Sequence, residues 1–425
     1  MVNRLKARLP LKKKGALKGT FCRPQPRLAY RYQSMRSDIN VSHLASNTRF
    51  ENKSGLPGAA FSRMEPTYRL NAICPYYTMF PLEFPWGVLR DAKANDWVLD
   101  PFCGRGTSLY AARLRGLGAV GLDLNPVAVT LAATKLKSTS HQAVTSLCAK
   151  LLSEAGQPVE RPSDEFWNLA FHLSTLKQIC LLRERLANAG ADATTTVLRA
   201  LLLGVLHGPI LKGPPSFLSN QMPRTYSSKP GSAVRYWKKH DLLPPKVDVL
   251  DVVRRRAIHT LSAVPPTTPG YVRQGDAVTD ICKIDRQFKW VITSPPYYGM
   301  RTYAPDQWLR NWFLGGPPVV TYEVPGDLQH TGEDVFIGSL AKVWRAAATK
   351  CENGAQLVIR FGSIPSLKKD PHELIQRSLN ESDSGWKLNS VVPAGFPSSS
   401  SRQASQFSLP GNYIEEMDFY ATLEH

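Results

Sequence analysis

The chain has 425 residues, of which 43% are hydrophobic and 20% charged, so it is long enough to bury a large core and to carry an insertion. Its 53 Lys and Arg residues outnumber 34 Asp and Glu residues and give a formal charge of +19, which favours a polyanionic partner such as nucleic acid. A positive charge can also serve only solubility. The best candidate for a membrane segment, residues 200–211, is shorter than the ~18 apolar residues that a span needs, so we expect no membrane partner.

The seven cysteines are scattered along the chain and form no Cys-x-x-Cys pair. This spacing indicates neither a zinc site nor a disulfide framework, so the sequence predicts no metal. Reduced thiols are typical of a cytoplasmic protein, and a nucleic-acid partner would associate it with the nucleoid.

The N-terminal segment, residues 1–67, has no acidic residue before Asp38 and carries the run Lys12, Lys13 and Lys14. We expect a flexible basic arm that adds unspecific phosphate contacts. A solvated tail without function and an Arg-rich transit peptide are the alternatives.

Residues 68–138 form the predicted cofactor-binding half of a catalytic domain, in which a strand, a glycine turn and a helix follow one another. The strand is Trp97–Asp100, and Gly104 and Gly106 in the turn allow positive φ and close approach of a ligand to the backbone. A second predicted strand ends on Asp123, about 20 residues past the glycines, where nucleotide-binding βαβ units place an acid on ribose hydroxyls. Glycines alone also serve ordinary turns, whereas this whole succession indicates a nucleotide-like ligand.

The most informative motif lies at residues 293–298, where Thr-Ser-Pro-Pro-Tyr-Tyr follows an apolar strand. Prolines fix φ and lack a backbone N–H, so Pro295 and Pro296 keep the carbonyls of Ser294 and Pro295 rigid and available as acceptors. The Ser294 hydroxyl and the Pro295 carbonyl can hold an exocyclic NH2 group through its two protons, and the Tyr297 ring offers a face for a flipped base. A plain turn after a strand is the alternative for this motif on its own.

Together these motifs resemble those of the DNA methyltransferases that methylate base amines, and the SPPY motif resembles the N4-cytosine type. In that family, acids after three strands lie near the methionine, the ribose and the adenine of S-adenosylmethionine, which maps them to Asp100, Asp123 and Asp276. A looser match places a loop with Tyr77 and Thr78 over the methionine end. The resemblance therefore implies S-adenosylmethionine as cofactor, with a site formed by Tyr77, Thr78, Asp100, Phe102, Cys103, Gly104, Gly106, Thr107, Asp123 and Asp276.

The expected reaction is direct in-line transfer of a methyl group to N4 of cytosine, catalysed by positioning, with no covalent intermediate. The catalytic residues are expected to be Ser294, Pro295, Pro296 and Tyr297. Adenine N6 enzymes of the family usually carry Asp or Asn in place of Ser294, but all three side chains present an oxygen, so adenine is an alternative. Two further alternatives are an enzyme that methylates an RNA or tRNA base amine and a catalytically silent nucleic-acid-binding protein.

Residues 139–268 are predicted to be a mainly helical insertion. Apolar residues recur at spacings of three and four over residues 166–186 and 195–206, which predicts two helices that face a core. Further on, and again after the catalytic motif through Trp308 and Trp312, cations alternate with aromatic residues, as suits phosphate contacts and base stacking. The expected contacts with double-stranded DNA are Arg224, Tyr226, Lys229, Arg235, Trp237, Arg301 and Arg310. The family resemblance also implies a role in restriction or phage defence, with a cognate nuclease as partner.

Strands that alternate with helices predict an α/β fold with a doubly wound, mainly parallel sheet. Residues 269–425 form its catalytic half, and the stretches 386–392 and 416–421 predict a closing hairpin. The family resemblance implies a Rossmann-like class I methyltransferase fold with seven strands, of which the last is antiparallel. We therefore expect the cofactor turn and the catalytic turn to face each other at neighbouring strand ends.

Overall fold

The computed structural model describes residues 66–76, 80–223, 229–299, 304–320, 332–362, 369–394 and 416–424, all within one compact unit, residues 59–425. The basic arm predicted for residues 1–67 lies outside this description except for its last two residues. Five predicted site residues also lie outside it: Tyr77, Thr78, Arg224, Tyr226 and Arg301. None of the described helices combines the length and apolar character that crossing a bilayer requires.

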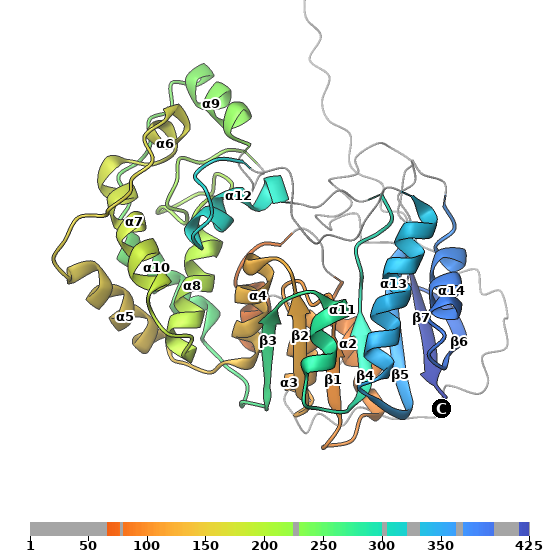
Figure 1. The fold of residues 1–425 in the computed structure, drawn as a ribbon. Coiled ribbons are helices and arrows are strands. Elements are labelled where there is room, and N and C mark those ends of the chain that lie inside the picture. Colours follow the sequence, from red (N-terminus) through yellow and green to blue (C-terminus); the bar gives the residue numbers. More distant parts are fainter. Residues whose placement is uncertain are drawn as a thin grey trace, which may run out of the picture. The chain divides into compact units, whose positions relative to one another are not determined.

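The described strands form one sheet of seven in the order β3-β2-β1-β4-β5-β7-β6 (Figure 1). They are β1 (Trp97–Asp100), β2 (Gly118–Asp123), β3 (Gly270–Gln274), β4 (Phe288–Thr293), β5 (Cys351–Gly362), β6 (Trp386–Pro393) and β7 (Glu416–Leu423). Strands β1 to β5 pair in parallel, whereas β7 runs antiparallel to both β5 and β6. The predicted parallel sheet, antiparallel last strand and closing hairpin are therefore confirmed.

Strands β1 and β4 are apolar in the residues that lead to their carboxyl ends because helices cover both faces of the sheet. In β1, Val98 and Leu99 are fully buried, and so are Val291 and Ile292 in β4. The described helices outside the insertion are α1 (Pro66–Arg69), α2 (Glu83–Val88), α3 (Thr107–Leu114), α4 (Pro126–Ala133), α11 (Ala277–Asp280), α12 (Ala304–Phe313), α13 (Glu333–Ala348) and α14 (Pro371–Ser382).

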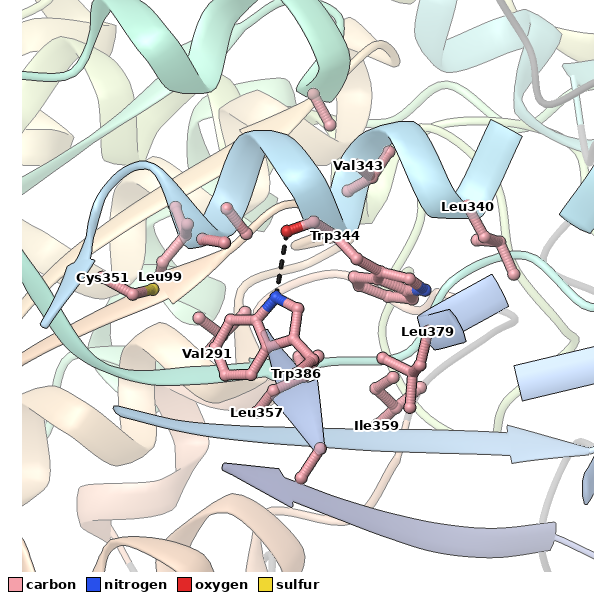
Figure 2. Packing of buried hydrophobic residues seen from close by; sticks show 14 of the residues in the cluster. Leu99, Val291, Leu340, Val343, Trp344, Cys351, Leu357, Ile359, Leu379 and Trp386 are labelled. Carbon is pink, nitrogen blue, oxygen red and sulfur yellow. Dashed lines mark hydrogen bonds between the residues drawn. The ribbon is translucent and has the colours of Figure 1, made fainter. Parts of the chain in front are cut away.

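The two faces of the sheet are covered by different helices. On one face, α3 comes so close to β2 that a Cβ on Gly121 would lie 2.8 Å from Leu109 Cδ1. On the opposite face, α11 and α13 bury their apolar sides in a cluster that includes residues of β1, β4 and β5, and α14 packs against α13 and β6. Figure 2 shows the centre of that layer, where Trp386 Nε1 donates to the Trp344 carbonyl at 3.0 Å beside Val291. This double covering fixes the strand ends on which the site is built.

The insertion is helical, with α5 (His141–Ser153), α6 (Glu165–Ala170), α7 (Leu173–Ala187), α8 (Ala193–Val205), α9 (Pro230–Lys239) and α10 (Val249–Thr260). Figure 1 shows these helices gathered beside the β3 edge of the sheet. The single helix predicted over residues 166–186 is wrong, because the chain is extended at Phe171 and a new helix begins after it. His172 Nδ1 accepts from the Ser174 N–H at 3.2 Å and so caps the start of α7.

One buried arginine ties both ends of the insertion to the sheet domain. Arg113 in α3 is 2% exposed, and its five N–H groups all donate. The acceptors are the carbonyls of Lys135, Lys137, Pro265 and Pro266 and the hydroxyl of Ser138. The chain therefore leaves for the insertion and returns from it at the same guanidinium.

We expect Arg113→Lys to lower the free energy of unfolding by about 3 kcal/mol, because an ammonium has three donors and leaves at least two buried acceptors without a partner. Chemical denaturation measures the change. Arg254→Lys is the matched control, since Arg254 is half exposed in an ion pair with Asp251, and its effect should stay under about 1 kcal/mol. Equal effects of the two substitutions would contradict the role of Arg113.

Candidate active site

The glycine turn after β1 holds its two positive-φ glycines for different reasons. Gly104 has φ +50°, and a Cβ there would meet only Tyr76 Cε1, at 3.9 Å. Gly106 has φ +79°, and a Cβ there would lie 2.7 Å from Ala132 Cα in α4. Gly106 is therefore required by the close packing of the turn on a helix, whereas Gly104 leaves room on the open side of the turn.

The acid that ends β2 is bound to the same turn. Asp123 Oδ2 accepts from the Gly104 N–H and Oδ1 from the Asn125 N–H, each at 2.9 Å. Asp123 also joins the next strand, because its carbonyl accepts from the Gly275 N–H at 3.1 Å. Asp276, just after β3, caps α11 by accepting from the Val278 N–H at 2.8 Å. The strand ends that carry these two predicted cofactor acids are thus in direct contact.

Asp100 is fully buried at the end of β1 and connects three elements. Its carboxylate accepts from the Ser108 hydroxyl of α3, from Thr293 Oγ1 of β4 at 2.7 Å and from the Phe102 N–H at 3.2 Å. Burial raises the pKa of Asp100 to about 6, although the hydrogen bonds from Ser108 and Thr293 oppose the rise. The Asp100 side chain therefore holds α3, the glycine turn and β4 together beneath the site. Its predicted contact with a ligand amine stays a prediction.

The bond between Thr293 and Asp100 joins the end of β4 to the end of β1, so the catalytic turn begins next to the cofactor turn. The expectation that these two turns lie at neighbouring strand ends is confirmed. Along the sheet order β3-β2-β1-β4, the carboxyl ends carry Asp276, Asp123, Asp100 and Ser294 in succession.

Within the catalytic turn, Ser294 is half buried and Pro295 is buried. The Tyr297 ring is 5% exposed and meets the Phe361 ring edge-on, with 5.2 Å between centroids. Its hydroxyl donates to Glu416 Oε1 of β7 at 2.7 Å, and burial, followed by the Glu416 charge, raises the pKa of the phenol well above its usual value. The ring is thus largely enclosed, and stacking of a base on it stays a prediction.

The remaining predicted cofactor residues line or support the glycine turn. Thr107 and Cys103 are buried, and Phe102 is half buried against the core. Burial, followed by the charges of Asp123 and Asp100, raises the pKa of the Cys103 thiol well above its usual value, so this side chain is neutral and serves packing.

The buried side chain of Lys135 holds the segment before residue 76 in place beside the glycine turn. Lys135 is fully buried, and its ammonium donates to the carbonyls of Leu70 at 2.7 Å and Asn71 at 3.3 Å. Burial lowers the pKa of this amine well below its usual value. The anchored segment continues to Tyr76, which borders Gly104, and then to the predicted positions Tyr77 and Thr78.

Two predicted DNA contacts are wrong because their side chains belong to the core. Trp237 is fully buried and donates through Nε1 to the Gln221 carbonyl at 3.1 Å, so no base can stack on it. Arg310 is 4% exposed, and its guanidinium donates to the Leu203 carbonyl at 3.1 Å and to Gln307 Oε1 at 2.7 Å, so it does not face a phosphate.

The aromatic residues of α12 are core residues too, against the expectation that they face the substrate. Trp308 and Trp312 are each 2% exposed. Their ring centroids lie 5.6 Å and 4.3 Å from that of Trp167 in α6. The helix that follows the catalytic turn is therefore packed into the insertion. By contrast, the predicted DNA contacts Lys229 and Arg235, at α9, are exposed.

Thr293, Ser108 and Glu416 were not selected from the sequence, although each contacts a predicted site residue. Thr293 could have been found as the one polar side chain that ends the apolar strand β4. Glu416 had a weaker signal, namely two acids at alternate positions, Glu416 and Asp418, in a strand that is otherwise largely apolar.

No family model matches the chain. Among curated proteins, the Type II methyltransferase M.MjaII of Methanocaldococcus jannaschii is 28% identical over 94 residues, which cover 22% of this chain and 18% of that protein. Among solved structures, rRNA methyltransferase aviRa of Streptomyces viridochromogenes has a TM-score of 0.33 and 16% identity and covers 85% of this chain and 94% of its own. TrmN of Thermus thermophilus has a TM-score of 0.32 and 10% identity, and the match covers 84% of this chain and 53% of the TrmN chain.

The strand order and the direction of each strand define the fold. A doubly wound sheet places ligands outside the carboxyl ends of its parallel strands, where the predicted acids and the glycine turn lie. Carboxylates suit the amine and hydroxyl groups of S-adenosylmethionine, and the turn at Gly104 has the space that a close ligand needs. The chain therefore has a Rossmann-like, doubly wound fold, with strand ends that fit S-adenosylmethionine.

Proposed function

We propose that the protein is an S-adenosylmethionine-dependent DNA methyltransferase that modifies the N4 amine of cytosine. One observation supports this most directly, namely the order of Asp276, Asp123, Asp100 and Ser294 on four neighbouring strand ends. Neighbouring strands are ~4.8 Å apart, so these four positions span ~14 Å, enough for an extended nucleoside with a methionine arm. The adenine would lie at Asp276, the ribose at Asp123 and the methionine near Asp100, which leaves the amine at Ser294.

At the amine, the chain needs only to position and polarise the reacting nitrogen. The Ser294 hydroxyl oxygen and the Pro295 carbonyl accept the two amine protons and so orient the nitrogen lone pair toward the methyl group. Bound S-adenosylmethionine supplies that methyl group on a sulfonium, which is already a good leaving group. The buried Pro295 and its neighbour Pro296 keep the acceptor carbonyls in place.

The preference for cytosine rests on Ser294, which stands where the adenine N6 enzymes that this chain resembles usually carry Asp or Asn. The partial similarity to a Type II methyltransferase supports methyl transfer as the reaction. The formal charge of +19 supports a nucleic-acid partner. We infer double-stranded DNA, and a cognate nuclease in a restriction or defence system, from the family resemblance.

The exposed cations of the α9 segment are candidates for phosphate contacts. We expect the triple substitution of Lys229, Arg235 and Lys239 by Ala to weaken DNA binding and to lower the slope of log K against log salt by about 0.9 for each phosphate that is no longer neutralised. Fluorescence anisotropy at several salt concentrations measures both. Lys150→Ala, an exposed lysine on α5, is the control. An unchanged salt slope in the triple variant would remove α9 from the DNA interface.

The proposed activity is tested by incubating the protein with labelled S-adenosylmethionine and, separately, double-stranded DNA, tRNA and single-stranded RNA. Mass spectrometry of the digested nucleosides then identifies the product. We expect N4-methylcytosine from DNA. N6-methyladenine, or methylation of RNA alone, would replace the proposed substrate, and the absence of product on every nucleic acid would contradict an enzymatic role.

A further inference from the structure

The carboxyl ends of β1 and β4 meet where the strand order reverses along the sheet, which is the place where doubly wound folds bind their ligands. The backbones of β1 and β4 pair as far as Leu99 with Val291, whereas β4 stays paired with β5 up to Thr293. Beyond Leu99 and Val291, the hydrogen bond from Thr293 Oγ1 to Asp100 Oδ1 joins the two strand ends at 2.7 Å. A side-chain bond therefore continues the link between these strands past the end of their backbone ladder.

The link consists of side chains that solvent does not reach. Asp100, Ser108 and Thr293 are all fully buried. The Asp100 carboxylate accepts from the Ser108 hydroxyl on Oδ2 and from Thr293 Oγ1 on Oδ1, and Oδ1 also accepts from the Phe102 N–H at 3.2 Å. Ser108 belongs to α3 and Phe102 to the glycine turn, so Thr293 is the donor among these three that comes from β4.

Packing alone does not require a hydroxyl at position 293. The two residues before it, Val291 and Ile292, are apolar and fully buried, and a valine in place of Thr293 would have nearly the same shape. A hydroxyl and a carboxylate removed from water carry a desolvation cost, which their hydrogen bonds offset. Unlike an apolar contact, the hydrogen bond also fixes a distance and a direction between the two strand ends.

Both partners of this bond lie next to the groups that the proposed reaction brings together. Ser294, the proposed acceptor of the amine, follows Thr293 directly, and the glycine turn of the proposed cofactor site begins after Asp100. In-line transfer needs the reacting atoms about 3–3.5 Å apart, and a misplacement of about 1 Å can cost about 100-fold in rate. The spacing of the two strand ends is therefore part of the reaction geometry.

We propose that Thr293 is a positioning residue that sets the distance between the methyl donor and the amine through its bond to Asp100. This role rests on the proposed function. Thr293 does not itself touch the reacting atoms, because it is fully buried and its hydroxyl donates to the Asp100 carboxylate. Loss of the bond lets the catalytic turn move relative to the glycine turn, while Asp123 still accepts from the Gly104 N–H.

The test is single-turnover methylation of duplex DNA at saturating S-adenosylmethionine by the full chain and by its Thr293→Val variant. Valine keeps the shape and removes the donor, and Asp100 Oδ1 still accepts from the Phe102 N–H. We expect transfer to be about 30-fold slower, with less than about a threefold change in the affinity for S-adenosylmethionine in calorimetric titration. Thr293→Ser keeps the donor and should bring the rate back to within about threefold of that of the unchanged chain.

Two further variants separate this role from a general effect of disturbing a buried threonine or the Asp100 carboxylate. Thr175→Val removes a fully buried hydroxyl that donates to the Val247 carbonyl at 3.0 Å within the insertion, and its rate should be unchanged. Ser108→Ala removes the other hydroxyl donor of Asp100 without touching β4, and it should slow transfer far less than Thr293→Val does. Equal losses in Ser108→Ala and Thr293→Val would assign the effect to the carboxylate itself and would overturn the proposal.

Hydrogen–deuterium exchange gives a readout that needs no substrate. In Thr293→Val, the amides of residues 291–299 should exchange about 10-fold faster than in the unchanged chain, whereas those of α10 should not change. Unchanged exchange at residues 291–299, or a Thr293→Ser variant as slow as Thr293→Val, would overturn the positioning role. Should Thr293→Val not fold, Thr293→Ala takes its place with the same expectations. If the unchanged chain methylates no base amine, the proposed function fails, whereas the exchange result still decides whether Thr293 holds the catalytic turn.

Discussion

Ser294→Ala is expected to slow methyl transfer about 100-fold at saturating S-adenosylmethionine and DNA, which corresponds to ~3 kcal/mol of transition-state stabilisation. The substitution removes the side-chain acceptor of the amine while Thr293 still holds the end of β4 to Asp100 at 2.7 Å. The turn should therefore keep its position, and the loss should appear in the rate of the chemical step. Single-turnover assays with labelled S-adenosylmethionine measure it.

Ser294→Thr is the control for that experiment because it keeps a hydroxyl at the same position. Its rate should lie well above that of Ser294→Ala, and both variants should bind S-adenosylmethionine as the unchanged chain does. If Ser294→Ala transfers methyl groups at the original rate, Ser294 does not hold the amine and the assignment of the catalytic turn is wrong.

Gly106→Ala is expected to lower the free energy of unfolding by about 3 kcal/mol and to weaken S-adenosylmethionine binding. A left-handed backbone costs an alanine about 1–2 kcal/mol, and the overlap adds about 1–3 kcal/mol because the new Cβ would lie only 2.7 Å from Ala132 Cα. Relief of that overlap must push the turn away from α4. Since the turn also holds Asp123 through the Gly104 N–H, the ribose side of the site should shift with it.

Gly104→Ala separates conformation from overlap. Its φ is also positive, at +50°, but the new Cβ would meet only Tyr76 Cε1, at 3.9 Å. Denaturant unfolding should therefore show a decrease of about 1–2 kcal/mol, the conformational cost alone. If the two alanine variants are equally stable, the packing of Gly106 against α4 is not what makes this glycine necessary.

The parts of the site that follow a strand were accessible from the sequence. Trp97–Asp100 is an apolar run that ends in an acid, and a glycine turn and then a helix follow it, so local pattern and tertiary role agree. The same holds for the strand before Ser294. Because the carboxyl ends of parallel strands share one edge of a sheet, these local signals were enough to bring the two turns together.

The features of the site that depend on which face of a helix packs against which neighbouring element could not be predicted from the sequence. Trp237, Trp308 and Trp312 stand among cations and resemble a base-stacking surface, yet the structure packs them against Trp167 and Phe166. A tryptophan in a basic segment suits both a core and a nucleic-acid surface, and only the packing of α9 and α12 against α6 decides between them. Glu416 was missed for a similar reason, because it contacts Tyr297 but lies 119 residues away from it in the sequence.

A crystal structure of the full chain with S-adenosylhomocysteine tests the central claim most directly. We predict the adenine beside Asp276, the ribose hydroxyls on Asp123, and the sulfur turned toward Ser294 and Pro295. A ligand bound in the reverse direction, or with its sulfur on the far side of the sheet from the catalytic turn, would contradict this placement.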